Sequence, residues 1–210
     1  VASCLFVAQP GGQTGSLVRF INFKGNGFKL MSQIDMDRQF IPVNFAILTV
    51  SDTRSINDDL SGNLLAEKIQ TAGHFVISRD ITTDDERKIV LRLKKLVERE
   101  DVDVILSTGG TGLTGRDVTV EAHKKIYEKE IDAFGTLFTL ISFEKIGTSA
   151  IQSRATAGVA GGKYLFALPG SPSACKDAWY GIIEKQFDYR HRPCNFVEIM
   201  PRLDEHMRRK

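Results

Sequence analysis

A short apolar strand that runs into a glycine-rich loop and an Arg-Asp pair constrains the fold of this chain more than any other stretch. Residues 102–108 read VDVILST, a β-branched apolar run that is typical of a strand buried on both faces. The loop GGTGLTG follows at 109–115, and Arg116 and Asp117 stand before a helix expected from residue 118. Proteins of the α/β class build phosphate sites in this way, at the carboxyl edge of the sheet.

The glycine loop also admits other interpretations. Gly110, Gly112 and Gly115 match the dinucleotide fingerprint G-x-G-x-x-G, which would indicate a nicotinamide-dependent oxidoreductase. That fingerprint usually follows the first strand of a domain, whereas two strands are expected earlier here, and it leaves the Arg-Asp pair unexplained. A tight turn without a ligand is a further alternative. A P-loop is not present, because the GGK at 161–163 is followed by Tyr164 rather than by Ser or Thr.

Composition excludes several classes of protein. The chain has 210 residues, of which 42% are hydrophobic, enough for one sizeable core, and its net charge of +2 gives no case for nucleic acid or membrane partners. Cys4, Cys175 and Cys194 are odd in number and widely spaced, which favours neither a disulfide framework nor a zinc site and indicates a cytoplasmic location. No apolar run approaches the roughly 20 residues of a membrane span, and residues 1–30 lack the layout of a signal peptide.

Strand and helix patterns alternate along most of the chain. Strands are expected at 43–50, 75–81, 102–108, 155–159 and 164–168, the last two as a hairpin or as two sheet strands, and helices at 61–72, 84–100, 118–128, 133–146 and 171–183. This order predicts an α/β fold with three layers, α/β/α, and a mainly parallel sheet. Residues 1–41 are interpreted as an N-terminal extension with a short strand near 17–23, residues 42–188 as the domain, and residues 189–210 as a C-terminal tail.

Right-handed crossovers bring the loops after parallel strands to one edge of the sheet. Ser51 and Asp52, Asp84 and Asp85, and the loops 109–117 and 169–171 are therefore expected to converge there. Helix capping is the simpler role for one of the two acids at 84 and 85, and Asp52 has a similar alternative role as the anchor of its own loop.

Several motifs, taken jointly and in order, resemble the MoaB/MogA family of molybdenum cofactor biosynthesis proteins, also found as domains of gephyrin. They are TVSDTR at 49–54, DLSG at 59–62, GGTG at 109–112, RDVT at 116–119, GT at 147–148, SRA at 153–155 and LPGSP at 168–172. The resemblance covers about residues 43–188. RPCNF at 192–196 resembles MoaB more than MogA, and the first 41 residues have no counterpart in the family.

The resemblance implies a MogA-like, molybdopterin-binding fold and a molybdopterin adenylyltransferase. Such an enzyme uses MgATP to adenylylate the terminal phosphate of molybdopterin, giving adenylyl-molybdopterin and pyrophosphate. The family's acidic residues map onto Asp84 and Asp117, as catalytic groups and Mg²⁺ ligands; Asp85 is an adjacent candidate because Thr83 stands where many members have proline. The substrate-binding residues that we expect are Ser51, Asp52, Ser61, Gly62, Gly109, Gly110, Thr111, Gly112, Arg116, Pro169, Gly170 and Ser171.

These residue types suit the chemistry that the resemblance implies. The attacking phosphate is already an anion, so no strong base is needed, and the difficulty is to bring two phosphates together. Loop N–H groups can hold phosphate oxygens and carboxylates can hold Mg²⁺, while Arg116 could pair either with phosphate or with a neighbouring carboxylate. A binding or scaffold protein that holds molybdopterin, or a partner protein, without turnover remains the alternative from another functional class.

The helix expected at 133–146 is apolar on more than one side. Its apolar residues, too many for one helix face, are Phe134, Leu137, Phe138, Leu140, Ile141 and Phe143. A neighbouring subunit could cover the outer side, or residues 1–41 could fold over it instead. The resemblance favours the first alternative and implies threefold symmetry, as a homotrimer or a homohexamer.

Overall fold

The computed structural model describes residues 33–208, so the strand predicted near residues 17–23 lies outside the described residues. The strands are β1 Gln33–Ile34, β2 Asn44–Val50, β3 Phe75–Thr82, β4 Val104–Thr108, β5 Lys129–Glu130, β6 Thr156–Ala160, β7 Lys163–Leu168 and β8 His191–Arg192. The α-helices are α1 Leu60–Thr71, α2 Glu86–Val97, α3 Thr119–Lys124, α4 Asp132–Ile146, α5 Pro172–Ala178, α6 Glu184–Gln186, α7 Phe196–Ile199 and α8 Glu205–Arg208. None of these helices is long and apolar enough to cross a bilayer.

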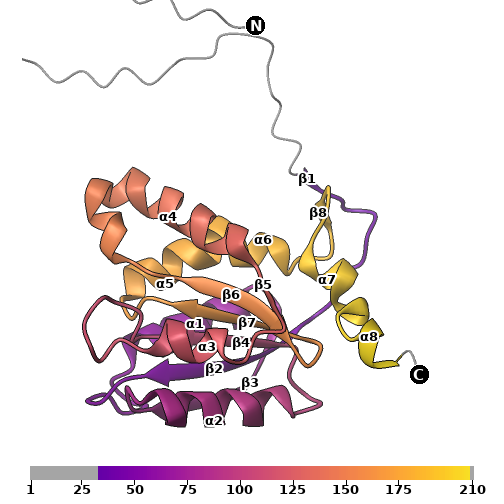
Figure 1. Cartoon of the computed structure of the whole chain (residues 1–210). Helices are drawn as coiled ribbons and strands as arrows, with labels where there is room; N and C mark the ends of the chain where they lie inside the picture. Colours follow the sequence, from indigo (N-terminus) through magenta and orange to yellow (C-terminus); the bar gives the residue numbers. More distant parts are fainter. Residues whose placement is uncertain (1–32, 209–210) are drawn as a thin grey trace, which may run out of the picture. The chain divides into compact units, whose positions relative to one another are not determined.

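The central sheet has six strands in the order β3-β2-β4-β7-β6-β5 (Figure 1). Strands β3, β2, β4 and β7 run parallel, whereas β6 is antiparallel to both β7 and β5. The mainly parallel sheet is therefore confirmed. Of the two alternatives predicted for the segments around 155–168, the hairpin is observed: β6 and β7 pair antiparallel and are joined by the turn at Gly161 and Gly162.

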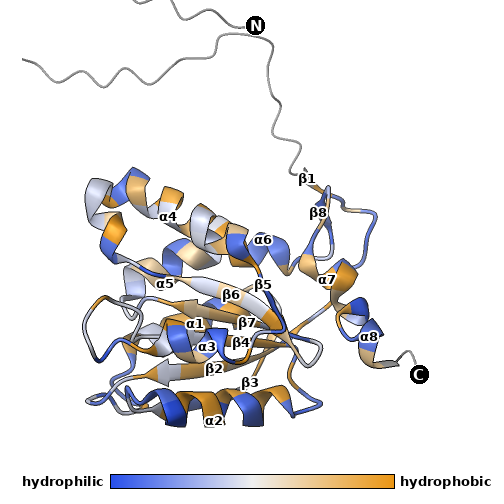
Figure 2. Ribbon diagram, viewed as in Figure 1, coloured by the Kyte–Doolittle hydropathy of each residue, from blue (hydrophilic) through white to orange (hydrophobic). Residues whose placement is uncertain are grey.

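Alternate side chains of the central strands feed two hydrophobic cores, one on each face of the sheet. Phe45 and Ile47 of β2 pack with α1, α4 and α5, while Ala46 and Leu48 pack with α2 and α3. The central strands are apolar along their length for this reason (Figure 2). Helices cover both faces, which confirms the three-layer α/β/α fold.

Two predicted helices have different ends in the structure. Helix α2 begins at Glu86 rather than at residue 84, because the Asp85 side chain accepts a hydrogen bond from the N–H of Lys88 and so caps the helix. Helix α3 ends at Lys124 rather than at residue 128, because Glu128 N–H already bonds Val159 O as the chain enters β5. The helix predicted to end at residue 183 continues through a π-helical turn, Trp179–Ile183, into α6.

The segment predicted as a C-terminal tail packs on the domain. Phe196 stacks on Tyr164 of β7 with ring centroids 4.7 Å apart, and the Tyr164 hydroxyl donates to Phe196 O at 3.0 Å. Strand β8 pairs with β1, and the Arg38 guanidinium lies 3.7 Å from the centre of the Tyr189 ring. The hydrophobic core thus extends beyond residue 188.

Candidate functional site

The predicted site residues lie where the sheet topology switches direction. Strand β2 connects through α1 to β3 on one side, whereas the chain leaving β4 builds β5, β6 and β7 on the other side. Ser51 and Asp52 follow β2, and Gly109 follows β4, so they flank the point at which adjacent connections diverge. Ligands of open α/β sheets bind in the crevice at such a point.

The loops after β2, β4 and β7 approach one another closely at Gly109. This residue has φ +102°, and a Cβ added to it would lie 2.2 Å from Val50 O. Its N–H donates to Leu168 O at 3.0 Å, and a Cβ added to Gly170 would lie 3.1 Å from its Cα. Only glycine permits this backbone at residue 109, which explains part of the glycine run.

Residues from three loops meet around Asp52. The backbone N–H of Asp84 donates to Asp52 Oδ1 at 3.2 Å, and Arg116 forms an ion pair with the other carboxylate oxygen. Asp84 in turn lies against the glycine loop, since a Cβ added to Gly110 would be 2.6 Å from Asp84 Oδ1. The convergence predicted for these segments is thus observed, and in this structure Arg116 pairs with a carboxylate.

The two adjacent acids Asp84 and Asp85 have different surroundings. Asp85 caps α2, and its hydrogen bond from Lys88 N–H lowers the pKa of its carboxyl. Burial raises the pKa of Asp84, as do the nearby charges of Asp52 and Asp117, against an opposing effect of Arg116. Asp84 is therefore the acid directed to the glycine loop, and Asp85 has the capping role.

Asp117 is held within its own loop. Its Oδ2 accepts hydrogen bonds from the hydroxyl of Thr114 at 2.6 Å and from Thr114 N–H at 2.9 Å. The hydroxyl bond is the main reason that the pKa of Asp117 is lowered. A Cβ on Gly112 would lie 2.8 Å from the same oxygen, so this glycine lets the carboxylate pack on the loop.

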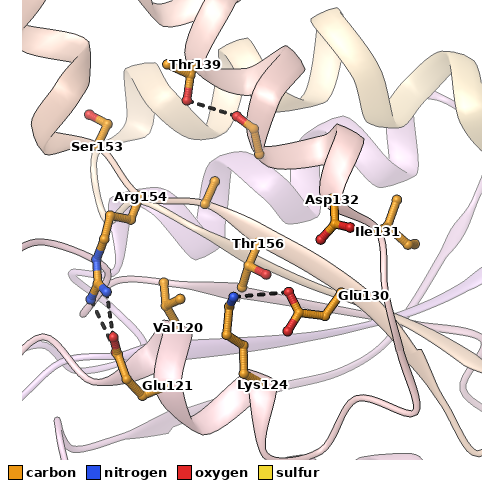
Figure 3. Close-up of a pocket in the computed structure, with 12 residues that line it drawn as sticks. Val120, Glu121, Lys124, Glu130, Ile131, Asp132, Thr139, Ser153, Arg154 and Thr156 are labelled. Atoms are coloured by element: carbon orange, nitrogen blue, oxygen red, sulfur yellow. Dashed lines mark hydrogen bonds and ion pairs between the residues drawn. The ribbon is translucent and has the colours of Figure 1, made fainter.

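Arg154 secures the far side of the glycine loop, and the sequence reasoning assigned it no role. Its Nε donates to Thr111 O at 2.9 Å and to Gly112 O at 3.0 Å, and its guanidinium also pairs with Glu121 and donates to Asp117 O at 3.2 Å. Figure 3 shows the guanidinium directed toward Glu121. The SRA motif at 153–155 was the available signal.

The loop after β7 is tied to the start of α1. The Ser61 hydroxyl donates to Gly170 O at 2.7 Å, and Pro169 O accepts a hydrogen bond from the Thr108 hydroxyl at 3.0 Å. The side chain of Ser171 caps α5 by accepting from Ala174 N–H. Four of the predicted binding residues, Ser61, Pro169, Gly170 and Ser171, thus take part in bonds that hold the loop after β7 in place.

A buried carboxylate that the sequence reasoning did not single out supports the start of α1. Asp59 is 1% exposed; it accepts from Gly62 N–H at 2.9 Å and from the Thr49 hydroxyl at 2.6 Å. A Cβ on Gly62 would lie 2.0 Å from the carboxylate, so Gly62 serves this packing. The three-residue spacing from Asp59 to Gly62 is the usual signal of such a cap.

A cavity of about 470 Å³ lies beside this edge of the sheet, between α3, α4 and the start of β6 (Figure 3). Its walls carry two ion pairs, Arg154 with Glu121 and Lys124 with Glu130. None of the predicted site residues lines it. Arg154 connects it to the glycine loop, since the guanidinium contacts both.

The acidic residues at this edge fit a Mg²⁺ ion. Residues 33–208 contain no group of three or more His, Cys, Asp or Glu side chains placed to hold a metal. Mg²⁺, however, commonly takes one or two protein carboxylates and completes its shell with substrate phosphate and water. Burial is the main reason that the pKa of Asp84 is raised, and the negative charges of Asp52 and Asp117 raise it further; a cation bound there would offset these charges.

Comparison with known proteins gives consistent similarities. The family described as "Probable molybdopterin binding domain" matches residues 46–189. Molybdenum cofactor biosynthesis protein B of Escherichia coli K12 is 46% identical over 166 residues, 79% of this chain and 96% of the relative. A probable molybdopterin adenylyltransferase of Methanocaldococcus jannaschii is 41% identical, over 68% of this chain and 89% of the relative. A crystal structure of molybdenum cofactor biosynthesis protein B superposes with a TM-score of 0.73 at 40% identity, covering 80% of this chain and 99% of that one.

Proposed function

This chain belongs to the MoaB/MogA family of molybdopterin-binding proteins of molybdenum cofactor biosynthesis, and we propose that it is a molybdopterin adenylyltransferase. It would transfer AMP from ATP, with Mg²⁺, to the terminal phosphate of molybdopterin and release pyrophosphate. The observation that carries the proposal is the meeting of Asp84, Asp52 and Arg116 with the glycine loop at the switch point of the sheet. The 41% identical relative named as a probable molybdopterin adenylyltransferase supports the same activity.

The glycine loop offers unoccupied donors to the phosphates. Among residues 33–208, the N–H groups of Gly110 and Thr111 find no acceptor. Backbone donors of this kind suit phosphate oxygens, and fixed donors stabilise charge that develops during transfer. Arg116 is 70% exposed at its side chain, so exchanging Asp52 for a phosphate requires no burial of charge.

The remaining groups have complementary tasks. The molybdopterin phosphate forms a new bond to the α-phosphorus of ATP while the bond to pyrophosphate breaks, and no protein base has to take a proton. Asp84 and Asp117 would hold Mg²⁺, which supplies charge neutralisation for the departing pyrophosphate. Around them, Ser51, Ser61, Gly109, Gly112 and the loop 169–171 would contact the substrates.

The test is a turnover assay with purified protein, molybdopterin, ATP and Mg²⁺. We expect stoichiometric pyrophosphate and adenylyl-molybdopterin, detected by a coupled assay and mass spectrometry, and none after chelation with EDTA. Tight molybdopterin binding without pyrophosphate would favour the scaffold alternative. A change in nicotinamide fluorescence on titration would point to the oxidoreductase instead.

The outer side of α4 supports assembly into a homotrimer or homohexamer. Phe134 and Phe138 are buried in the domain, whereas Leu137, Leu140 and Phe143 are 49–57% exposed. Such an apolar surface needs a cover, and a second copy of the chain would supply it. Light scattering at micromolar concentration should give a mass of three or six chains, and a monodisperse monomer would reject the proposal.

We also place the enzyme in the cytoplasm, where its substrates would be available.

A further inference from the structure

Thr119, the first residue of α3, carries a buried hydroxyl without a partner. The residue is 0% exposed, and its Oγ1 makes no hydrogen bond to any atom of residues 33–208. Its backbone N–H donates to Gly110 O at 2.9 Å, which fixes the residue beneath the glycine loop. A buried hydroxyl without a partner costs stability, so its presence beside the site requires a reason.

Gly110 separates this hydroxyl from the carboxylate of Asp84. A Cβ added to Gly110 would lie 2.5 Å from Thr119 Oγ1 and 2.6 Å from Asp84 Oδ1. The two oxygens are therefore no more than about 5 Å apart, because both lie close to the same point. The Asp84 carboxylate accepts a hydrogen bond from the backbone of Asp52 but none from a side chain of residues 33–208. An unsatisfied donor, the Thr119 hydroxyl, and a carboxylate that can accept further hydrogen bonds therefore face the same glycine.

We propose that Thr119 is a positioning residue for Asp84. When the ligands enter, rotation of the Asp84 side chain brings Oδ1 within reach of the Thr119 hydroxyl, which donates a hydrogen bond to it. The second oxygen, Oδ2, is then held in one direction, toward the cation. Partners behind a metal ligand commonly fix its orientation in this way, and a hydrogen bond to a carboxylate is stronger than one between neutral groups. This inference rests on the role proposed above for Asp84.

The test uses Thr119→Val, which keeps the shape of the side chain and removes the hydroxyl. We expect kcat to fall about tenfold or more, while KM for molybdopterin changes by less than about twofold. The melting temperature of the free protein should stay the same or rise, because an unsatisfied group has been removed. Thr119→Ser keeps the donor and should restore most of the rate.

Ser78→Ala is the matched control. Ser78 lies on β3, and its hydroxyl is likewise buried without a partner, but it is not at the glycine loop. This variant should leave kcat unchanged and should not lower the melting temperature. A melting temperature that drops by several degrees in Thr119→Val, but not in Ser78→Ala, would make Thr119 a structural residue and overturn the proposal.

A binding readout and a double mutant separate this inference from the one on which it rests. MgATP should raise the melting temperature of the wild type more than that of Thr119→Val, and Thr119→Val should add no further loss of kcat to Asp84→Ala. An equal further loss would overturn the link between the two residues. A wild-type rate for Asp84→Ala would refute the role of Asp84 itself, whereas a wild-type rate for Thr119→Val beside an impaired Asp84→Ala would refute only the role of Thr119.

Discussion

The turn that carries Asp84 and the loop that carries Asp117 both lie against the glycine loop. Their carboxylates differ in how firmly hydrogen bonds hold them in the ligand-free structure. The Asp117 carboxylate already accepts two hydrogen bonds from Thr114, and Arg154 holds the backbone around it. The Asp84 carboxylate accepts a hydrogen bond from the backbone of Asp52 but none from a side chain of residues 33–208, and burial, followed by the charges of Asp52 and Asp117, raises its pKa. Asp117 is thus set in place before any ligand arrives, whereas the final position of Asp84 depends on what binds.

The largest effect is expected from substituting Asp117, the acid that is already held in place. We expect Asp117→Asn to lower kcat on the order of a hundredfold or more, because the substitution removes the charge and keeps the size. An Asn oxygen can still accept from Thr114, so the melting temperature should fall by only about 1 °C. Steady-state kinetics and thermal melting check both points. A near wild-type rate in a protein of unchanged stability would remove Asp117 from the mechanism.

The Asp84 turn allows a matched pair of variants. We expect Asp84→Ala to lower kcat about tenfold to a hundredfold with little effect on molybdopterin binding, since the residue acts in transfer. Asp85→Ala should keep the rate but lower the melting temperature through the lost cap of α2. Rate measurements, molybdopterin titrations and melting curves distinguish the two. A larger rate defect in Asp85→Ala would move the functional acid by one residue, and a collapse of affinity at a retained rate would make Asp84 a binding group.

Arg154 tests whether the Asp117 loop is held from outside. A lysine cannot reproduce the fork that reaches Thr111 O, Gly112 O and Glu121, so Arg154→Lys should lower kcat/KM about tenfold. Amide hydrogen exchange should quicken at residues 111–118 and stay unchanged at residues 83–86. Arg99→Lys is the control, because Arg99 forms a comparable pair with Asp101 after α2, with no contact to the glycine loop. Faster exchange in both segments would mean that the two loops are not held independently.

The sequence correctly predicted which loops meet at the carboxyl edge of the sheet. It did not predict the different roles of the individual acidic residues there. Strand patterns and crossover rules placed Asp52, Asp84 and the glycine loop together, because these depend on local signals and on topology. They left the choice between Asp84 and Asp85 open, since either could cap a helix and only the direction of each side chain decides. The structure shows that Asp85 caps α2 through the bond from Lys88 N–H, which favours Asp84 as the functional acid.

Contacts between residues far apart in the sequence could not be predicted from strand and helix patterns. Arg154 stands some 40 residues from the loop that it holds, and no periodicity links the two. Thr119 belongs to the RDVT motif at 116–119, yet its unpaired hydroxyl is a property of packing that sequence patterns do not carry. The side of α4 that faces outward was predictable only as an excess of apolar residues, and the structure identifies Leu137, Leu140 and Phe143 as that side.

The smallest expected effect concerns stability against pH, and it should differ in sign between the two acids. The fold raises the pKa of Asp84 above its unfolded value of about 3.9. The contribution of this group to stability is therefore fully present below about pH 3.9, and it is lost as the pH rises through the pKa of the folded state. Asp84→Asn should therefore melt higher than the wild type at pH 7, with the gain vanishing below about pH 4. The fold lowers the pKa of Asp117, so its contribution is present above about pH 3.9 and is lost as the pH falls through the folded pKa.

Asp117→Asn should accordingly melt lower than the wild type at pH 7, and the difference should shrink as the solution is acidified. Both shifts should be on the order of 1 °C from the charge alone, because solvent screens partly exposed carboxylates. Melting temperatures of the ligand-free proteins from pH 3 to pH 7 give the two difference curves. Curves of the same sign would show that the two acids share one environment, and the contrast between a preset Asp117 and a ligand-dependent Asp84 would then fail.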